Sequence, residues 1–103
     1  QPHLFSRTRD FAEDFVNAFM DSDVLIITDI YPSREKPIPG ITGELLVEHA
    51  RRIGHKHVTY IPQLKDVVPA VVRQGRDGDM IITMGAGNIY QLPDQIVAAL
   101  ECK

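Results

Sequence analysis

The feature that most constrains the fold is a run of apolar, mostly β-branched residues, Val24-Leu25-Ile26-Ile27-Thr28-Asp29-Ile30. The run does not alternate between apolar and polar residues, as a strand with one face in water would. It is typical of a strand that is buried on both faces, as in a parallel sheet. Parallel neighbours must be joined by a long crossover, usually a helix, so the run requires helices elsewhere in the chain.

Helical and strand patterns do alternate along the rest of the chain. Apolar residues at helical spacing predict helices over residues 8–21, 42–53, 66–74 and 90–100. Further strands are predicted over 57–61 and 79–84, and three prolines mark 31–40 as a loop. This order predicts an α/β fold: a Rossmann-like, three-layer α/β/α arrangement around a mainly parallel sheet.

Residues at the helix boundaries support these limits. Ser6 or Thr8 can cap the first helix and Thr42 the second, Gly54 can end the second, and Pro69 suits the first turn of the third. The apolar stripe of the second helix is predicted to comprise Leu45, Leu46, His49, Ala50 and Ile53.

Ligands of parallel sheets bind outside the carboxyl ends of the strands. The loops that follow the predicted strands are 29–40, 62–65 and 85–88, and all three should lie at one edge. Residues 1–7 directly precede a helix. By the same alternation they should follow a strand that this chain does not contain. The joints 22–23, 54–56 and 75–78 should lie at the opposite edge.

Composition excludes several classes of protein. The chain has 103 residues, enough for one domain, and a net charge of −3, which argues against a dedicated nucleic-acid binder. The longest apolar runs are about five residues, against the ~20 that a membrane-spanning helix needs. Its one cysteine, Cys102, allows no internal disulfide and fits a reducing compartment. Because the chain begins with Gln1 rather than Met, we expect a fragment of a larger protein.

A glycine-rich segment, Gly85-Ala86-Gly87-Asn88, follows the last predicted strand and opens into a helix. Such a turn presents backbone N–H groups that suit an anionic or polar ligand. It lacks the third glycine of a dinucleotide fingerprint and the Gly-Lys-Ser/Thr of a triphosphate loop. Two hypotheses stay open: a ligand contact, favoured by the position at the ligand edge, or close packing that only glycine permits.

Other polar residues at this edge have two interpretations each. Arg7, with His3 nearby, could bind a phosphate or carboxylate, or could belong to a solvated terminus. Asp29 and Tyr31 could form a functional loop at a strand end, or Asp29 could simply cap a turn. The loop 31–40 could be a lid or substrate wall, or only a surface connection.

No catalytic residue and no metal site are predicted. The spacing of His49, His55 and His57 does not match a helical pair, and no cysteine or carboxylate cluster completes a ligand set. Cys102 has no identified base beside it.

Three motifs, in order along the chain, resemble a known family. Gln1–Asp10 (QPHLFSRTRD) is similar to a "QPHRYSRTRD" segment, Asp29–Gly40 to "D-V-Y-P-A-x-E-x-P-I-x-G", and Asp77–Ile89 to "DGD…GAGNI". These segments belong to the C-terminal domain of the Mur ligases that act on UDP-N-acetylmuramate. The resemblance covers essentially the whole chain.

The resemblance implies an ATP-dependent ligase of cytoplasmic peptidoglycan precursor synthesis. In that family one domain binds the UDP sugar, a central domain binds ATP, and the last binds the incoming amino acid. ATP phosphorylates the muramyl carboxylate, and the amino group of L-alanine attacks the acyl phosphate. ATP and Mg²⁺ would be bound mainly by the missing N-terminal and central domains, so no cofactor is expected in this chain. The fragment alone would not be catalytic.

By position, the resemblance implies that His3 and Arg7 face anionic groups of the substrates. Asp29 and Tyr31 would line the cleft, and Gly85, Ala86, Gly87 and Asn88 would approach the amino acid. Leu4 and Phe5 replace the Arg and Tyr of many members, so a contact made by that arginine cannot be made here.

The family domain also includes a strand before this chain begins, which predicts a sheet truncated at its N-terminal side. Two alternatives remain: the recycling ligase that attaches a tripeptide to the same sugar nucleotide, and a non-catalytic Rossmann-like binding module.

Overall fold

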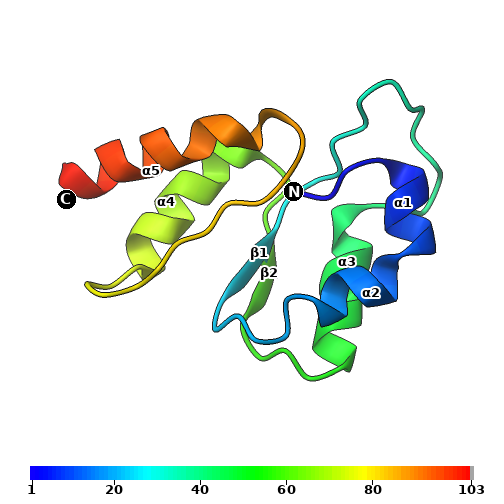
Figure 1. Ribbon diagram of the computed structural model, residues 1–103, viewed down its shortest axis with the longest axis horizontal. Coiled ribbons are helices and arrows are strands. Elements are labelled where there is room, and N and C mark those ends of the chain that lie inside the picture. Colours follow the sequence, from blue (N-terminus) through cyan, green and yellow to red (C-terminus); the bar gives the residue numbers. More distant parts are fainter. Residues whose placement is uncertain (103) are drawn as a thin grey trace.

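The computed structural model describes residues 1–102 and has a small parallel sheet at its centre (Figure 1). Strand β1 (Leu25–Ile27) pairs in parallel with β2 (Val58–Tyr60), with Leu25 opposite Val58 and Ile27 opposite Tyr60. The prediction of an α/β fold with parallel strands is therefore confirmed. Both strands are shorter than predicted, because pairing is limited to these three residues.

Helices precede, connect and follow the strands. They are α1 (Phe5–Asp10), α2 (Ala12–Asn17), α3 (Gly43–Arg52), α4 (Leu64–Gln74), the 3₁₀ helix η1 (Asn88–Gln91) and α5 (Leu92–Glu101). In Figure 1, α4 and α5 lie on one side of the strands and α1, α2 and α3 on the other. Within residues 1–102, no helix has the length and apolar character needed to cross a membrane.

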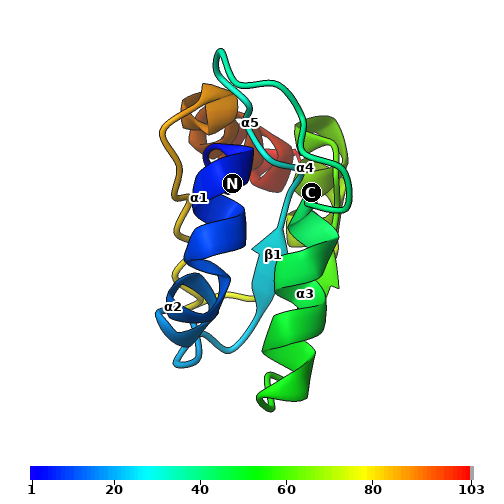
Figure 2. The same ribbon diagram turned by 90° about the vertical axis from the view of Figure 1, so that its right-hand side faces the viewer.

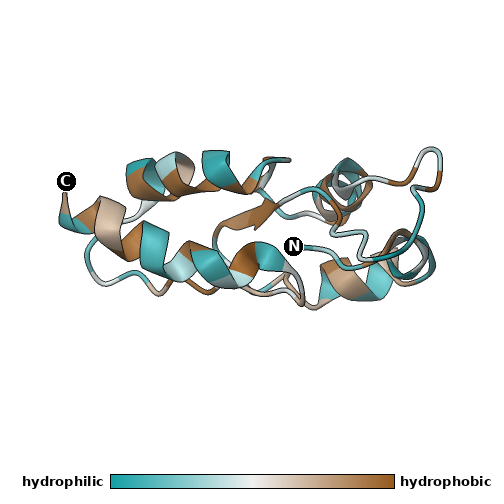
Figure 3. Ribbon diagram, turned by 90° about the horizontal axis from the view of Figure 1, so that it is seen from above, coloured by the Kyte–Doolittle hydropathy of each residue, from teal (hydrophilic) through white to brown (hydrophobic). Residues whose placement is uncertain are grey.

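The apolar core consists of two clusters that meet at β1. Leu25 and Ile27 pack with α2 and α3, whereas Ile26 packs against the cluster built by α4, η1 and α5. In Figure 3 the strand is brown, with helices on either side. The most buried partners in the two clusters are Val16, Leu46, Val47, Ala50, Leu92 and Ile96. Strand β1, at the centre of the run at 24–30, is thus packed on both faces, as predicted, whereas Val24 at the start of the run is 50% exposed.

The first predicted helix, 8–21, is wrong in its bounds. The helix begins at Phe5, is interrupted at Phe11 (φ −119°, ψ 23°) and ends at Asn17. Neither Ser6 nor Thr8 caps it, because residues 2–4 are paired with another segment and the helix starts directly after them. The Thr8 hydroxyl instead donates back to the Leu4 carbonyl at 2.8 Å.

Two other helix predictions need correction. Helix α4 starts at Leu64, two residues earlier than predicted, so Pro69 lies inside the helix rather than in its first turn. In α3 the buried stripe includes Val47, while Ile53 is 42% exposed. Thr42 precedes α3 without a side-chain capping bond, and Gly54 ends the helix region with a φ of +106°, as predicted for a C-terminal glycine.

The predicted strand over 79–84 does not form. Figure 1 shows this segment as a plain cord, and no described segment pairs with it as a strand. Met80 and Ile82 are 85% and 69% exposed. The apolar pattern is right for a buried strand, but a strand needs a neighbour to satisfy its backbone groups. At the end of the segment, the Gln1 amino nitrogen donates to the Met84 carbonyl (2.9 Å).

Candidate functional site

A hollow of about 490 Å³ lies at the carboxyl ends of the strands. Its lining comes from the segments that follow each strand, together with the first residue: Gln1, Asp29, Ile30, Tyr31, Pro32, Pro62, Gln63, Leu64, Lys65 and Asn88. This convergence confirms the prediction that these loops share one edge. The volume falls within the usual range for small-molecule sites.

Asp29 lines the hollow and lies two residues beyond the end of β1. Its Oδ1 accepts hydrogen bonds from the backbone N–H of Ile30 (3.1 Å) and from the hydroxyl of Tyr60 (3.2 Å). Burial raises the pKa of Tyr60, and the negative charge of Asp29 raises it further. Tyr60 therefore stays protonated at neutral pH and holds the carboxylate at the hollow.

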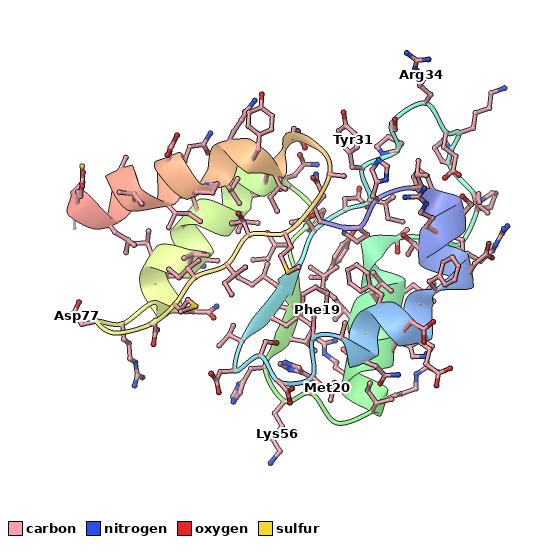
Figure 4. All side chains as sticks on the ribbon, viewed as in Figure 1. Phe19, Met20, Tyr31, Arg34, Lys56 and Asp77 are labelled. Carbon is pink, nitrogen blue, oxygen red and sulfur yellow. The ribbon has the colours of Figure 1, made fainter. Side chains whose placement is uncertain are left out.

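Tyr31 connects the hollow to the N-terminal segment. Its backbone N–H donates to the Pro2 carbonyl (2.8 Å), and its carbonyl accepts from the Leu4 N–H (2.9 Å). The rings of His3 and Tyr31 stack, with centroids 6.0 Å apart and planes 15° apart. Residues 2–4 thus run parallel to the segment that follows β1. Figure 4 labels Tyr31 in this segment.

The two glycines of the 85–88 segment are explained by close packing. A Cβ on Gly87 would lie 2.6 and 2.8 Å from the two Cδ atoms of Tyr31. A Cβ on Gly85 would lie 2.8 Å from the Ile89 side chain and 3.1 Å from the Cβ of Gln1. The packing hypothesis therefore accounts for both glycines. Ligand contact by their backbone stays a prediction.

Asn88 is the member of this segment that lines the hollow. Its Oδ1 accepts a hydrogen bond from the Gln1 side-chain amide at 2.9 Å. Ala86 is exposed and does not belong to the lining. The segment therefore presents one polar side chain to the hollow.

Arg7 is not brought to the hollow. It lies on α1, is exposed, and is absent from the lining, as is His3. Of the eight predicted site residues, the structure places Asp29, Tyr31 and Asn88 around one space, with His3 and Gly87 packed on Tyr31.

Sequence reasoning did not single out Gln1, Gln63 and Lys65, which also line the hollow. For Gln63 and Lys65, the only signal in the sequence is that the loop 62–65 is predicted to lie at the ligand edge. The residues of this loop carry no motif of their own. Lys65 and Asp29 bring opposite charges to the same space.

The opposite edge has a smaller hollow of about 210 Å³, lined by the joint residues 22–23 and 54–56 together with Met20 and His57. Figure 4 labels Met20 and Lys56 there. His55 is buried; its Nδ1 accepts from the His57 backbone N–H (3.2 Å), and its Nε2 lies 3.1 Å from the Ser22 hydroxyl. His55 thus links the joint at 54–56 to the joint at 22–23.

The three motifs meet around the hollow at the carboxyl ends of the strands, and comparisons with known proteins agree with these motifs. The family described as "Mur ligase, glutamate ligase domain" matches residues 1–87. The chain belongs to the Mur ligase family. Each of the three motifs of this family contributes lining residues: Gln1, then Asp29 to Pro32, then Asn88.

Individual Mur ligases are similar over the whole chain. The UDP-N-acetylmuramate–L-alanine ligase of Geotalea uraniireducens (strain Rf4) is 48% identical over 98% of the chain. The enzymes of the same name from Brachyspira hyodysenteriae (strain ATCC 49526 / WA1) and Cutibacterium acnes (strain DSM 16379 / KPA171202) are 45% and 46% identical over 98% and 100% of it. The chain spans only 22% of the length of each of these relatives.

Proposed function

We propose that this chain is the C-terminal, amino-acid-binding domain of an ATP-dependent ligase that joins L-alanine to UDP-N-acetylmuramate. The reaction would pass through an acyl phosphate in the cytoplasmic synthesis of peptidoglycan precursors. The observation that carries this proposal is the hollow built from all three family motifs, in a chain 48% identical to a relative named for that reaction.

The chemistry of the hollow suits a small zwitterion. Asp29 offers a carboxylate toward an ammonium group, and Lys65 offers a cation toward a carboxylate. Asn88 and Tyr31 add polar and aromatic surface. A site with few convergent polar groups can orient an α-amino acid such as L-alanine.

ATP and Mg²⁺ would be held mainly by another domain, because the sequence contains no Gly-Lys-Ser/Thr phosphate-binding loop. Mg²⁺ assists phosphoryl transfer by neutralising charge on the phosphates. Arg7, exposed on α1, and His3 would meet anionic groups of the substrates when the domains close together.

The domain would be a three-layer, Rossmann-like unit that is incomplete at its N-terminal side. The added strand would lie between β1 and residues 79–84. Two contacts support this placement: residues 2–4 pair with Tyr31 on one side, and the Gln1 nitrogen bonds to the Met84 carbonyl on the other. The exposed Met80 and Ile82 would then be covered.

Hydrogen exchange on the intact protein tests this strand. The N–H groups of Leu25 and Asp29 point toward β2 and its extension, so the alternate N–H groups of Ile26 and Thr28 point away from β2. We expect all four amides to be protected when the strand is present. Rapid exchange at Ile26 and Thr28, with Leu25 protected, would contradict the placement.

The activity is tested by incubating the intact protein with ATP, Mg²⁺, UDP-N-acetylmuramate and either L-alanine or the tripeptide. Amide formation with L-alanine, coupled to phosphate release, is expected. Preference for the tripeptide would indicate the recycling ligase instead. Tight, saturable ligand binding by the 103-residue chain without catalysis in any longer form would favour a binding module.

The role of Asp29 is tested in the same assay. Asp29→Asn should raise the KM for L-alanine, because the ammonium group loses its charged acceptor. Asp94→Asn, an exposed position on α5, is the matched control. Equal KM values for the two variants would remove Asp29 from the amino-acid site.

A further inference from the structure

The loop 31–40 and helix α1 are joined by one carboxylate, that of Glu35. Its Oε1 accepts the backbone N–H of Ser6 at 3.0 Å, and its Oε2 accepts the Ser6 hydroxyl at 2.5 Å, across 29 residues of sequence. Figure 2 shows the loop arching over the start of α1. Helix α1 has no capping side chain of its own, since Leu4 stands at the cap position. Glu35 supplies that cap from outside the helix.

Electrostatics favour the charged form of this cap. The Ser6 hydroxyl is the main cause that lowers the pKa of Glu35. Burial opposes this effect and is second in size only to the Ser6 hydroxyl. The backbone N–H groups of Ser6 and Phe5 and the positive charge of Arg9 lower the pKa further. Glu35 is therefore ionised at neutral pH. A carboxylate in this place satisfies N–H groups that would otherwise lack a partner and complements the helix dipole.

The loop is also fixed where it starts. Tyr31 is paired through its backbone with Pro2 and Leu4, and the Glu35 N–H donates to the Pro32 carbonyl at 2.9 Å. The resulting turn directs Glu35 toward α1. Arg34, at the tip of this turn, points away from the molecule in Figure 4.

We infer that Glu35 is a positioning residue, which fixes helix α1 and its Arg7 relative to the wall of the hollow formed by Tyr31 and Pro32. The inference rests on the proposed function, in which the hollow binds L-alanine and Arg7 meets a substrate anion. Because Glu35 already occupies the first N–H groups of α1, a substrate anion would meet the Arg7 side chain and not the helix end. Without Glu35, the pairing of Tyr31 with Pro2 and Leu4 still joins the two parts, but the loop no longer fixes the first turn of α1.

The test uses the intact ligase and three variants. Glu35→Ala removes both acceptors, Glu35→Gln keeps one, and Glu13→Ala removes an exposed carboxylate from α2 as the matched control. Activity is measured as kcat and KM for L-alanine, together with the thermal midpoint of each variant.

We expect Glu35→Ala to lower kcat/KM for L-alanine by about 10- to 100-fold, the size of effect that a displacement of about 1 Å produces. The loss should lie mainly in KM, and Glu35→Gln should recover part of it. The thermal midpoint of Glu35→Ala should fall below that of Glu13→Ala only by the ~2–4 °C that a lost helix cap costs. If Glu35→Ala fails to fold, Ser6→Ala, which removes only the hydroxyl donor, should show a smaller change in the same direction.

Unchanged kinetics in Glu35→Ala would overturn the inference while leaving the proposed function intact. A fall in thermal midpoint well beyond ~4 °C, with no recovery of activity in Glu35→Gln, would also overturn it and assign Glu35 to stability alone. A wild-type enzyme that forms no amide with L-alanine would refute the proposed function itself, and the inference with it.

Discussion

Substitution of Gly87 by alanine tests the close approach between the glycine-rich segment and Tyr31. The added Cβ would lie within 2.8 Å of three atoms of the Tyr31 ring, including both Cδ atoms, so one of the two segments must move. The φ of Gly87 is −102°, which any residue can adopt, so the cost is steric. Tyr31 cannot retreat easily, because its backbone is bonded on both sides to residues 2–4.

The expected cost follows from overpacking. Inserting one methyl group into a packed contact costs about 1–3 kcal/mol, which for a domain of this size lowers the thermal midpoint by roughly 4–24 °C. The free energy of unfolding is measured by urea denaturation, monitored by circular dichroism. Tyr31→Ala removes the opposing ring, so Gly87→Ala in that background should cost at least ~1 kcal/mol less.

Gly40 provides the control, since its φ is +81° and no atom lies within 4 Å of an added Cβ. Gly40→Ala should cost about 1–2 kcal/mol through backbone strain alone, and the cost should not depend on Tyr31. A neutral Gly87→Ala, or an equal cost with and without the Tyr31 ring, would refute the steric clash.

Three further predictions concern other contacts. Gly43→Ala should destabilise the chain more than Gly87→Ala, because the new Cβ collides with the backbone carbonyl of Thr28; urea denaturation of both variants checks the order. The contact between Glu35 and Ser6 should persist at neutral pH and be lost only as the pH falls below the ordinary glutamate value of 4.5, since the folded-state pKa is lowered. An NMR titration of the Ser6 amide should show this transition, and Glu35→Gln should abolish it. His55 should carry its proton on Nε2, because its Nδ1 accepts a backbone N–H; ¹⁵N chemical shifts of the ring report the tautomer, and a proton on Nδ1 would disprove the assignment.

The parallel α/β character and the ligand edge could be predicted because they depend on local patterns and chain order. The run at 24–30 indicates a strand buried on both faces, and it does separate the two core clusters through Leu25, Ile26 and Ile27. Alternation of elements then places all the following loops at one edge, and the hollow lies there.

The errors arise where distant contacts decide the outcome. The segment 79–84 has a strand pattern, but strand formation needs a neighbour that periodicity cannot supply. The cap of α1 comes from Glu35, 29 residues from its partner Ser6, so inspection of the helix boundary points to the wrong residues. The need for glycine at position 87 likewise comes from a distant partner, the Tyr31 ring, which no local pattern reveals.

The bond between the Gln1 nitrogen and the Met84 carbonyl has a consequence for how the domain should be produced. Burial lowers the pKa of this terminal ammonium group, so the fold disfavours its charge. In a chain where another residue precedes Gln1, the same nitrogen is a neutral amide that can donate the same bond without this penalty. Expression of the domain with even one or two additional residues before Gln1 should therefore make its stability less dependent on pH near the terminal pKa. A free amine at Gln1 instead makes the folded state gain stability as the pH rises toward 8.0, the ordinary pKa of the group.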